Sequence, residues 1–237
     1  MSPCSPVESI EASVYAVRSS IRAACARTGR DPSGVLLVAA SKSVELERIR
    51  RARDAGIQDF GENRAAELAA KAAHVEARWH FLGALQSGNA ARIADHAEVI
   101  HSGVPGRALE RIARRAAHQG KHIDCLLQVD FAGHRQGVAP EAVEEALGSI
   151  AELPGLRLVG LTTLPPLVPE PERGRPYFVR LRELRDHHRA EHPDLADLSM
   201  GMSADYEVAV EEGATMVRIG TALFGARPED GRENRPA

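Results

Sequence analysis

The sequence has few aromatic residues and no excess of basic charge. Phe, Trp and Tyr make up 4% of its 237 residues, and the formal net charge is -3 with a pI near 6.4. Nucleic-acid binding needs a positively charged surface, and binding of single strands also uses aromatic side chains on which bases stack. We therefore expect no nucleic acid among the partners of this protein.

Cysteines are also few, and long hydrophobic runs are missing. Cys4, Cys25 and Cys125 are far apart and form no CxxC pair, which argues against a disulfide framework and a zinc knuckle. We predict no metal site. No apolar run approaches the roughly 20 residues that cross a bilayer, and the first ten residues lack the basic-then-apolar order of a secretion signal. We expect a cytoplasmic protein without a membrane segment.

The sequence does contain an alternation of short apolar runs with helical patterns. The runs are too short for buried helices and are rich in β-branched or aromatic residues. They cover residues 35–40, 57–60, 79–85, 99–100, 123–129, 156–161, 198–200 and 216–219. Helical patterns lie between them, among them 44–55, 107–117, 141–151 and 177–190. About eight strands alternating with helices predict an α/β fold, a single (β/α)8 TIM barrel.

We expect residues 1–237 to form one domain with its barrel core over about 35–225. A helix is predicted over 5–29, because Ser5–Glu8 has the pattern of a capping box and Gly29 stops the helix. Residues 226–237 are typical of a flexible tail, and the prolines from Pro165 to Pro176 indicate a long surface loop.

In such barrels the functional groups lie where strands end and helices begin. Polar residues are frequent at these junctions: Ser41-Lys42, Gly61-Glu62-Asn63, Gln86-Ser87, His101-Ser102, Asp130, Thr162-Thr163, Met202-Ser203 and Gly220-Thr221. We therefore expect a ligand site at this end of the barrel.

Lys42 follows a small and apolar run and should project from the end of the first strand toward the barrel mouth. A lysine amine is nucleophilic only when neutral, and partial burial near positive charge lowers its pKa toward that state. Schiff-base chemistry is the resulting hypothesis. A solvated lysine that merely ends a strand is the alternative, since most lysines are exposed.

Arg218 lies between Val217 and Ile219, so in a strand its side chain points away from theirs, and an interior charge needs a partner. Pyridoxal 5′-phosphate (PLP) requires a lysine for its aldehyde, a phosphate cradle and a charged partner for its ring nitrogen. An arginine there would keep the ring nitrogen unprotonated and weaken the ring as an electron sink. An internal salt bridge to a barrel carboxylate is the alternative.

Ser203, Gly220 and Thr221 follow the last two predicted strands, where phosphate sites of these barrels are commonly found. Gly220 leaves room for close backbone approach, while Thr221 adds a hydroxyl and an amide at a helix start. Ser203 could instead cap the helix that follows it, and Gly220 could serve only a tight turn.

Five segments resemble the YggS/PROSC family of pyridoxal phosphate homeostasis proteins. They are Val38-Ala39-Ala40-Ser41-Lys42, Phe60-Gly61-Glu62-Asn63, Trp79-His80-Phe81-Leu82-Gly83-Ala84-Leu85-Gln86-Ser87, Leu198-Ser199-Met200-Gly201-Met202-Ser203-Ala204-Asp205 and Val217-Arg218-Ile219-Gly220-Thr221-Ala222-Leu223-Phe224-Gly225. The resemblance runs from about Val35 to Gly225. It implies a barrel like the amino-terminal domain of alanine racemase, with PLP bound as an internal aldimine on Lys42.

The resemblance also implies the roles of other residues. Ser203, Gly220 and Thr221 would hold the phosphate, Arg218 would face the ring nitrogen, and Asn63 would line the pocket. Met200 belongs to the matching segment and is included among the cofactor-binding candidates. His80 is a possible pocket residue, with a hydrogen-bonded strand histidine as its alternative.

The sequence departs from the family at two places. After the fifth strand, the family usually has an asparagine and a longer loop with a lysine. Here Asp130 leads into the shorter segment 131–137, so a role for that lysine does not transfer. Thr162 stands where the family often has methionine, a difference that we interpret as packing.

Members of this family are regarded as PLP carriers that affect amino-acid and keto-acid balance. Barrel racemases draw a tyrosine acid/base from a second domain. Tyr15, Tyr177 and Tyr206 fall in predicted helices instead. The leading hypothesis is a monomeric PLP-binding protein that delivers the cofactor to PLP-dependent apoenzymes.

Three alternatives stay open. The protein could be a PLP-dependent amino-acid racemase-like enzyme that uses Lys42 as its sole base. It could be a Schiff-base aldolase without cofactor, in which Lys42 attacks a sugar phosphate. It could also be a structural barrel whose polar junctions only cap helices.

Overall fold

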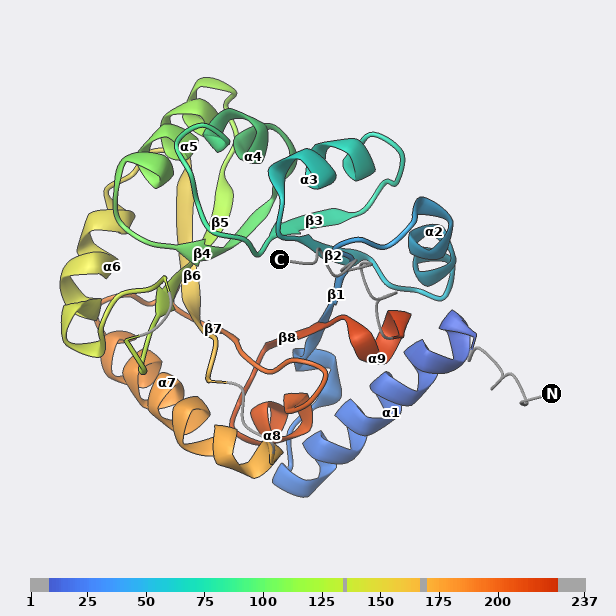
Figure 1. Ribbon diagram of the computed structural model, residues 1–237. Helices are drawn as coiled ribbons and strands as arrows, with labels where there is room; N and C mark the ends of the chain where they lie inside the picture. Colours follow the sequence, from blue (N-terminus) through green and yellow to red (C-terminus); the bar gives the residue numbers. More distant parts are fainter. Residues whose placement is uncertain (1–8, 134–135, 167–169, 226–237) are drawn as a thin grey trace, which may run out of the picture.

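Eight parallel strands close into a barrel in the computed structural model, which describes residues 9–133, 136–166 and 170–225 (Figure 1). The strands are β1 (Leu36–Ala40), β2 (Asp59–Glu62), β3 (Arg78–Phe81), β4 (Val99–Gly103), β5 (Ile123–Val129), β6 (Leu156–Thr163), β7 (Asp197–Ser199) and β8 (Met216–Ile219). They pair in sequence order, and β8 closes on β1 with Val38 opposite Arg218. The predicted (β/α)8 barrel is confirmed.

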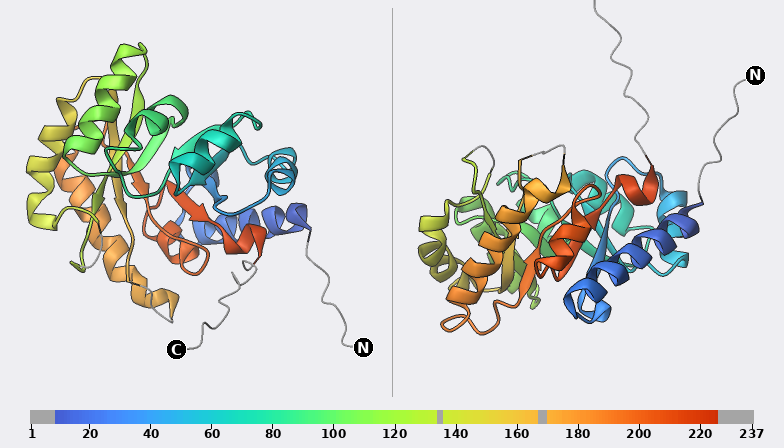
Figure 2. Two further views of the ribbon diagram at one scale, coloured as in Figure 1. Left: turned by 45° about the horizontal axis from the view of Figure 1, so that its top comes forward. Right: turned by 90° about the horizontal axis from the view of Figure 1, so that it is seen from below.

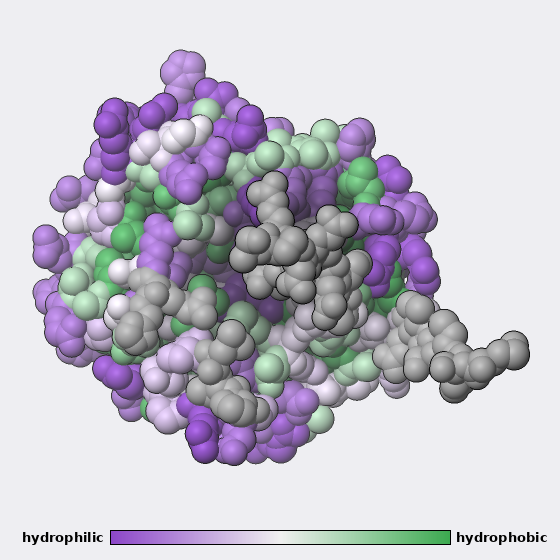
Figure 3. Space-filling view, in the orientation of Figure 1, coloured by the Kyte–Doolittle hydropathy of each residue, from purple (hydrophilic) through white to green (hydrophobic). Residues whose placement is uncertain are grey.

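Helices surround the strands on the outside (Figure 1). They are α1 (Ile10–Thr28), α2 (Leu46–Asp54), α3 (Ala65–Ala72), α4 (Ala90–His96), α5 (Arg107–His118), α6 (Val143–Ala151), α7 (Arg175–His188), α8 (Tyr206–Glu211) and α9 (Thr221–Phe224), with the short 3-10 turns η1 (Pro32–Gly34), η2 (Pro140–Ala142) and η3 (Pro171–Gly174). Of these helices, α3 and α4 were not predicted from the sequence. Hydrophilic side chains predominate at the rim of the molecule (Figure 3). Within the described ranges, none of the helices has the length and hydropathy of a membrane span.

The first helix packs against the helices that follow β1, β7 and β8. These are α2, α8 and α9 (Figure 2). Its side chains Ile10, Val14, Val17 and Ile21 are buried. Ser9 is its N-cap and accepts a hydrogen bond from the Ala12 amide at 3.1 Å. The predicted capping box at 5–8 lies outside the described residues, as does the predicted tail at 226–237. The predicted stop is confirmed, because Gly29 adopts the left-handed conformation with φ of 67°.

Several strand and loop boundaries differ from prediction. The third strand ends at Phe81, four residues earlier than expected, because its partner β2 ends at Glu62 and the Leu82 amide makes its last bond to the Glu62 carbonyl at 2.8 Å. Conversely, β6 extends to Thr163, since β5 offers partners as far as Val129. The predicted loop 165–176 contains η3 and the start of α7, and its residues 167–169 lie outside the described ranges.

The barrel interior is layered. Val99, Leu126, Val159, Met216 and Leu36 form a separate apolar cluster from five strands. Side chains alternate across a strand, so residues two further along point the same way. Arg218, two residues beyond Met216, therefore lies above this cluster, toward the carboxyl ends of the strands.

Gly83 allows two segments of the mouth to approach closely. A Cβ atom at this position would lie 2.0 Å from the Asn63 carbonyl oxygen and 2.7 Å from its carbonyl carbon, both of which are backbone atoms. Gly83→Ala should therefore lower the free energy of unfolding by about 1–3 kcal/mol, because the backbone at Asn63 must shift. Chemical denaturation measures this loss. Gly88→Ala is the control, since a Cβ there meets nothing within 4 Å, and an equal loss in both variants would contradict the prediction.

Candidate functional site

Lys42 lies just beyond β1, where the strand enters a tight turn. Ser41 is buried, Lys42 is exposed, and Ser43 adopts a left-handed backbone with φ of 60°. The Val44 amide closes the turn by donating to the Ser41 carbonyl at 2.9 Å. Lys42 thus stands at the carboxyl end of the barrel as expected, although it is more exposed than the predicted partial burial.

Arg218 lies inside the barrel with 6% of its surface exposed, while Val217 and Ile219 are buried in the main core. Its guanidinium donates to Thr162 Oγ1 at 3.1 Å, to the Thr163 carbonyl at 2.9 Å and to Ser199 Oγ. Burial lowers the pKa of Arg218 to about 10. Neutral oxygens satisfy the guanidinium, and in the part of the chain that the structure describes it makes no ion pair of the predicted alternative kind.

One cavity of about 180 Å³ joins these two groups. Its lining residues are Ala40, Lys42, Asn63, Leu82, His101, Gln128, Thr162, Leu164, Met202 and Arg218. Three predicted site residues, Lys42, Asn63 and Arg218, therefore meet at one place. The amine stands at the exposed mouth and the guanidinium lies in the buried wall.

The structure adds four polar or adaptable residues to this wall: His101, Gln128, Thr162 and Met202. Thr162 accepts from the Arg218 guanidinium and donates to the Ser199 carbonyl at 2.8 Å. We had interpreted the threonine at this position, where the family often has methionine, as a packing difference, and that interpretation was wrong. His101 was named as a junction residue but not as a candidate site residue. Strand alternation would have placed its side chain inside the barrel, because it lies two residues beyond the inward-facing Val99.

His80 is fully buried and does not belong to the cavity lining. Its Nε2 lies 2.9 Å from Asp59 Oδ1, and its Nδ1 lies 2.8 Å from His101 Nε2. The structure thus places it as a hydrogen-bonded strand histidine, the alternative considered above.

A buried hydrogen-bond chain links His80 to Arg218. His101 Nδ1 lies 2.7 Å from Ser199 Oγ, which accepts from the guanidinium. Burial lowers the pKa of both histidines, so each imidazole is neutral and carries one N–H. Because the Asp59 carboxylate can only accept, His80 Nε2 donates to it, and His80 Nδ1 accepts from His101 Nε2. His101 Nδ1 is then an acceptor, so the Ser199 hydroxyl donates to it while its oxygen accepts from Arg218.

Ser203 and Gly220 meet after β7 and β8, just beyond the lining residues Met202 and Arg218 in sequence but not among the lining residues themselves. Ser203 lines a different cavity, together with Ala222. Ser203 Oγ accepts hydrogen bonds from the Gly220 and Ala222 amides, each at 3.2 Å. It does not cap α8, whose N-cap residue is Asp205. Asp205 Oδ1 accepts from the Met202 amide at 2.7 Å and holds the loop instead. A hydroxyl and backbone amides therefore gather where the phosphate site was predicted, with Thr221 exposed next to them.

Met200 does not belong to the cavity lining, contrary to its inclusion among the cofactor-binding candidates. It is fully buried in the core, while Ser199 points into the barrel. The two residues are successive, so their side chains point to opposite sides. Gly201 then turns the chain with φ of 91°, and Met202 lines the cavity in place of Met200.

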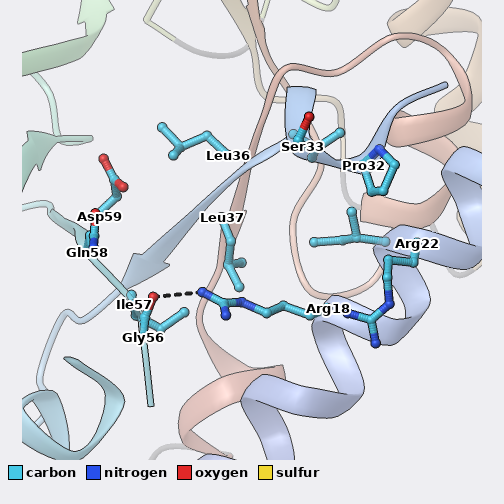
Figure 4. A pocket seen from close by; sticks show the side chains of 12 residues that line it. Arg18, Arg22, Pro32, Ser33, Leu36, Leu37, Gly56, Ile57, Gln58 and Asp59 are labelled. Atoms are coloured by element: carbon cyan, nitrogen blue, oxygen red, sulfur yellow. Dashed lines mark hydrogen bonds between the residues drawn. The ribbon is translucent and has the colours of Figure 1, made fainter. Parts of the chain in front are cut away.

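A different, larger cavity of about 460 Å³ lies at the amino-terminal ends of β1 and β2 (Figure 4). Arg18 crosses it from α1 and donates to the Gly56 carbonyl at 2.7 Å. Ligands of these barrels bind at the opposite end, where Lys42 and Arg218 lie. We therefore assign the candidate site to the smaller cavity.

Comparisons with known proteins agree with this geometry. A family model described as alanine racemase, N-terminal domain, matches residues 14–228. The pyridoxal phosphate homeostasis protein of Aquifex aeolicus is 41% identical, over 89% of this chain and 95% of its own length. The chain belongs to the YggS/PROSC family. The Pseudomonas aeruginosa family member is 38% identical, over 93% of this chain and 97% of its own length.

Solved structures extend the likeness of this YggS/PROSC protein. PipY of Synechococcus elongatus, solved with PLP bound, has a TM-score of 0.81 and 33% identity, covering 91% of this chain and all (100%) of PipY. Alanine racemase of Clostridium difficile has a TM-score of 0.75 at 15% identity, covering 94% of this chain and 61% of the racemase. The second likeness concerns the fold alone.

The neutral state of His101 in this YggS/PROSC barrel predicts a pH effect on stability. Its folded pKa lies below the unfolded value, so protons bind the unfolded chain more strongly as pH falls below about 6.5. Between pH 7 and pH 5, the wild-type protein should lose up to about 2 kcal/mol more unfolding free energy than His101→Gln. Urea denaturation across this pH range measures the difference, and parallel curves would contradict a neutral buried histidine.

Proposed function

We propose that this protein holds PLP as a Schiff base on Lys42 and delivers it to PLP-dependent apoenzymes in the cytoplasm. The observation that carries the proposal is the cavity shared by Lys42, Asn63 and Arg218. The hydrogen-bonded pair of Ser203 and Gly220, after the last two strands, supports it. The names of the relatives and the PLP bound to PipY support the same cofactor.

The residues present fit the chemical groups of PLP. Lys42 offers an exposed amine for the aldehyde, and Arg218 offers a buried cation to the ring nitrogen. Ser203, Gly220 and Thr221 would bind the phosphate through hydroxyl and amide groups. Asn63 and Met202 would border the ring from the mouth of the cavity. When bound, PLP supplies an electrophilic aldehyde and an electron-accepting ring.

The proton-transfer groups of the cavity favour a carrier over a racemase. Apart from the guanidinium of Arg218, the amine of Lys42 and the imidazole of His101 are the basic side chains that line the cavity. Both ring nitrogens of His101 already take part in the buried chain, so neither can serve a substrate. Tyr15, Tyr177 and Tyr206 all lie in helices and are not among the lining residues. Two-base chemistry would lack its second base.

The proposal also includes the state and place of the protein: one domain over residues 1–237, a monomer, in the cytoplasm. The match of one family model to residues 14–228 supports a single unit. Cys25 and Cys125 are buried free thiols, and burial raises the pKa of Cys125 to about 12, which suits a reducing compartment.

Replacing the proposed Schiff-base lysine tests the central step. Wild-type protein incubated with PLP and borohydride should gain one reduced PLP adduct on Lys42, located by peptide mass spectrometry. Lys42→Ala should lose this adduct while keeping its unfolding free energy within about 0.5 kcal/mol, because the side chain is exposed. The same assay with a sugar phosphate in place of PLP tests the aldolase alternative.

Transfer and turnover separate the carrier from the enzyme. PLP-loaded wild-type protein should restore the activity of a PLP-dependent apoenzyme, whereas loaded Lys42→Ala, carrying no covalent PLP, should not exceed free PLP. Racemisation or elimination of a panel of amino acids by the loaded wild-type protein would contradict a pure carrier role.

Ser203→Ala tests the phosphate cradle. A hydrogen bond to a charged group contributes about 1.5–3 kcal/mol, so PLP affinity should fall about 10- to 100-fold. Affinity for pyridoxal, which lacks the phosphate, should change less than about twofold. Equilibrium dialysis measures both affinities. Ser149→Ala, on an exposed face of α6, is the matched control. Equal losses for the two ligands would place the effect of Ser203 outside phosphate binding.

A further inference from the structure

A cluster of charged side chains lies directly behind the turn that carries Lys42. It consists of Glu62 at the end of β2 and of Glu67 and Lys71 in α3. Glu62 is fully buried, Lys71 is nearly so, and Glu67 is partly buried. The resemblance to the family assigns no role to any of these side chains.

Lys71 binds the backbone on the amino-terminal side of Lys42. Its ammonium group donates to the Ser41 carbonyl at 2.7 Å, to Glu62 Oε1 at 2.6 Å and to Glu67 Oε2 at 3.4 Å. An ammonium group has three N–H donors, and these three acceptors use all of them. The Lys71 amine is therefore fully engaged behind the turn, whereas Lys42 lines the cavity.

Glu67 binds the backbone on the other side of Lys42. Its Oε2 accepts from the Ser43 amide at 3.0 Å. Ser43 has a φ of 60°, a left-handed conformation that costs a residue with a side chain about 1 kcal/mol or more. Such a conformation persists when neighbouring groups hold it in place. The Glu67 carboxylate is one group that does so.

Glu62 anchors the cluster but is itself incompletely satisfied. Its Oε1 accepts from Ser41 Oγ at 2.7 Å and from Lys71, whereas its buried Oε2 has no hydrogen-bond partner within the described residues. Burial raises the pKa of Glu62. Buried ion pairs contribute little net stability compared with apolar packing. A cluster that leaves a buried oxygen unpaired is therefore poorly explained by stability alone.

We propose that Glu62, Glu67 and Lys71 are positioning residues that hold Ser41 and Ser43 in one conformation, so that the Lys42 amine enters the cavity. Because they bind the backbone on both sides of Lys42, they restrict the direction of its side chain without touching the ligand. This inference rests on the proposed Schiff base to Lys42. It deepens that proposal by naming what orients the amine.

The test compares a ligand that can bond to Lys42 with one that cannot. Pyridoxine 5′-phosphate has the ring and phosphate of PLP but no aldehyde. In Glu67→Ala, the Kd for PLP should rise about tenfold and Schiff-base formation should slow by a similar factor, since small misplacements of a reacting group have effects of this size or larger. The Kd for pyridoxine 5′-phosphate should change less than about twofold.

Rescue distinguishes positioning from general damage. Glu67→Gln keeps an amide oxygen that can accept from the Ser43 amide, so it should restore most of the PLP affinity that Glu67→Ala loses. Asp95→Ala is the matched control, because this carboxylate of α4 binds Arg115 in α5 and Gln119 directly after that helix. It should leave both ligands unaffected. Lys71→Met should weaken PLP selectively, as Glu67→Ala does. If Lys71→Met fails to fold, the comparison of Glu67→Ala with Glu67→Gln tests the positioning role by itself.

The outcomes separate this inference from the proposed function. If wild-type protein forms no borohydride-trapped adduct, the proposed function fails and this inference with it. If wild-type protein forms the adduct but Glu67→Ala binds PLP normally, only the positioning role is overturned. Equal weakening of PLP and pyridoxine 5′-phosphate also overturns it, because a disturbed cavity would affect both ligands. Selective loss of PLP with rescue by glutamine supports it.

Discussion

The burial of one positive charge inside the barrel organises the site. Arg218 has apolar residues below it and only 6% of its surface exposed, so its guanidinium needs acceptors from the barrel itself. Ser199, Thr162 and the Thr163 carbonyl provide them. Ser199 accepts from the guanidinium and donates to His101, and the hydrogen bonds continue through His80 to Asp59, whose carboxylate accepts the last of them. A charged interior group is thereby joined to a polar layer across several strands.

Closure of the barrel explains why residues from the two ends of the sequence meet. Arg218 pairs in register with Val38 on the neighbouring β1, and Lys42 lies four residues further toward the mouth. Ser203 and Gly220 follow the adjacent strands β7 and β8. In a parallel barrel all of these strand ends lie at one face. The separation between the amine and the guanidinium therefore follows from register, while the direction of the amine depends on the turn beyond the strand.

Local pattern predicted the features that depend on one strand or one helix stop. Lys42 and Arg218 were found because a polar residue follows or interrupts an apolar run. The end of the first helix was predicted at Gly29 because helices commonly end at a glycine. Features that depend on neighbouring strands could not be predicted in this way. Thr162 was interpreted as packing because its bond to Arg218 comes from another strand. Met200 was included because it belongs to a matching segment, and the turn at Gly201, which brings Met202 to the cavity, cannot be read from alternation alone.

The two sides of the cavity differ in a way that suits reversible binding. Its inner wall is rigid, because Arg218, His101 and Thr162 are all held by hydrogen bonds to other strands. Its outer side carries Lys42 and Asn63, which are exposed. The proposed Schiff base would form and break by loss and gain of water, and an exposed lysine would let water reach the bond in both directions. An enzyme that protects a reactive carbanion instead excludes water from its site. A hydrogen-bonded inner wall combined with an exposed lysine therefore fits the proposed storage and release better than catalysis.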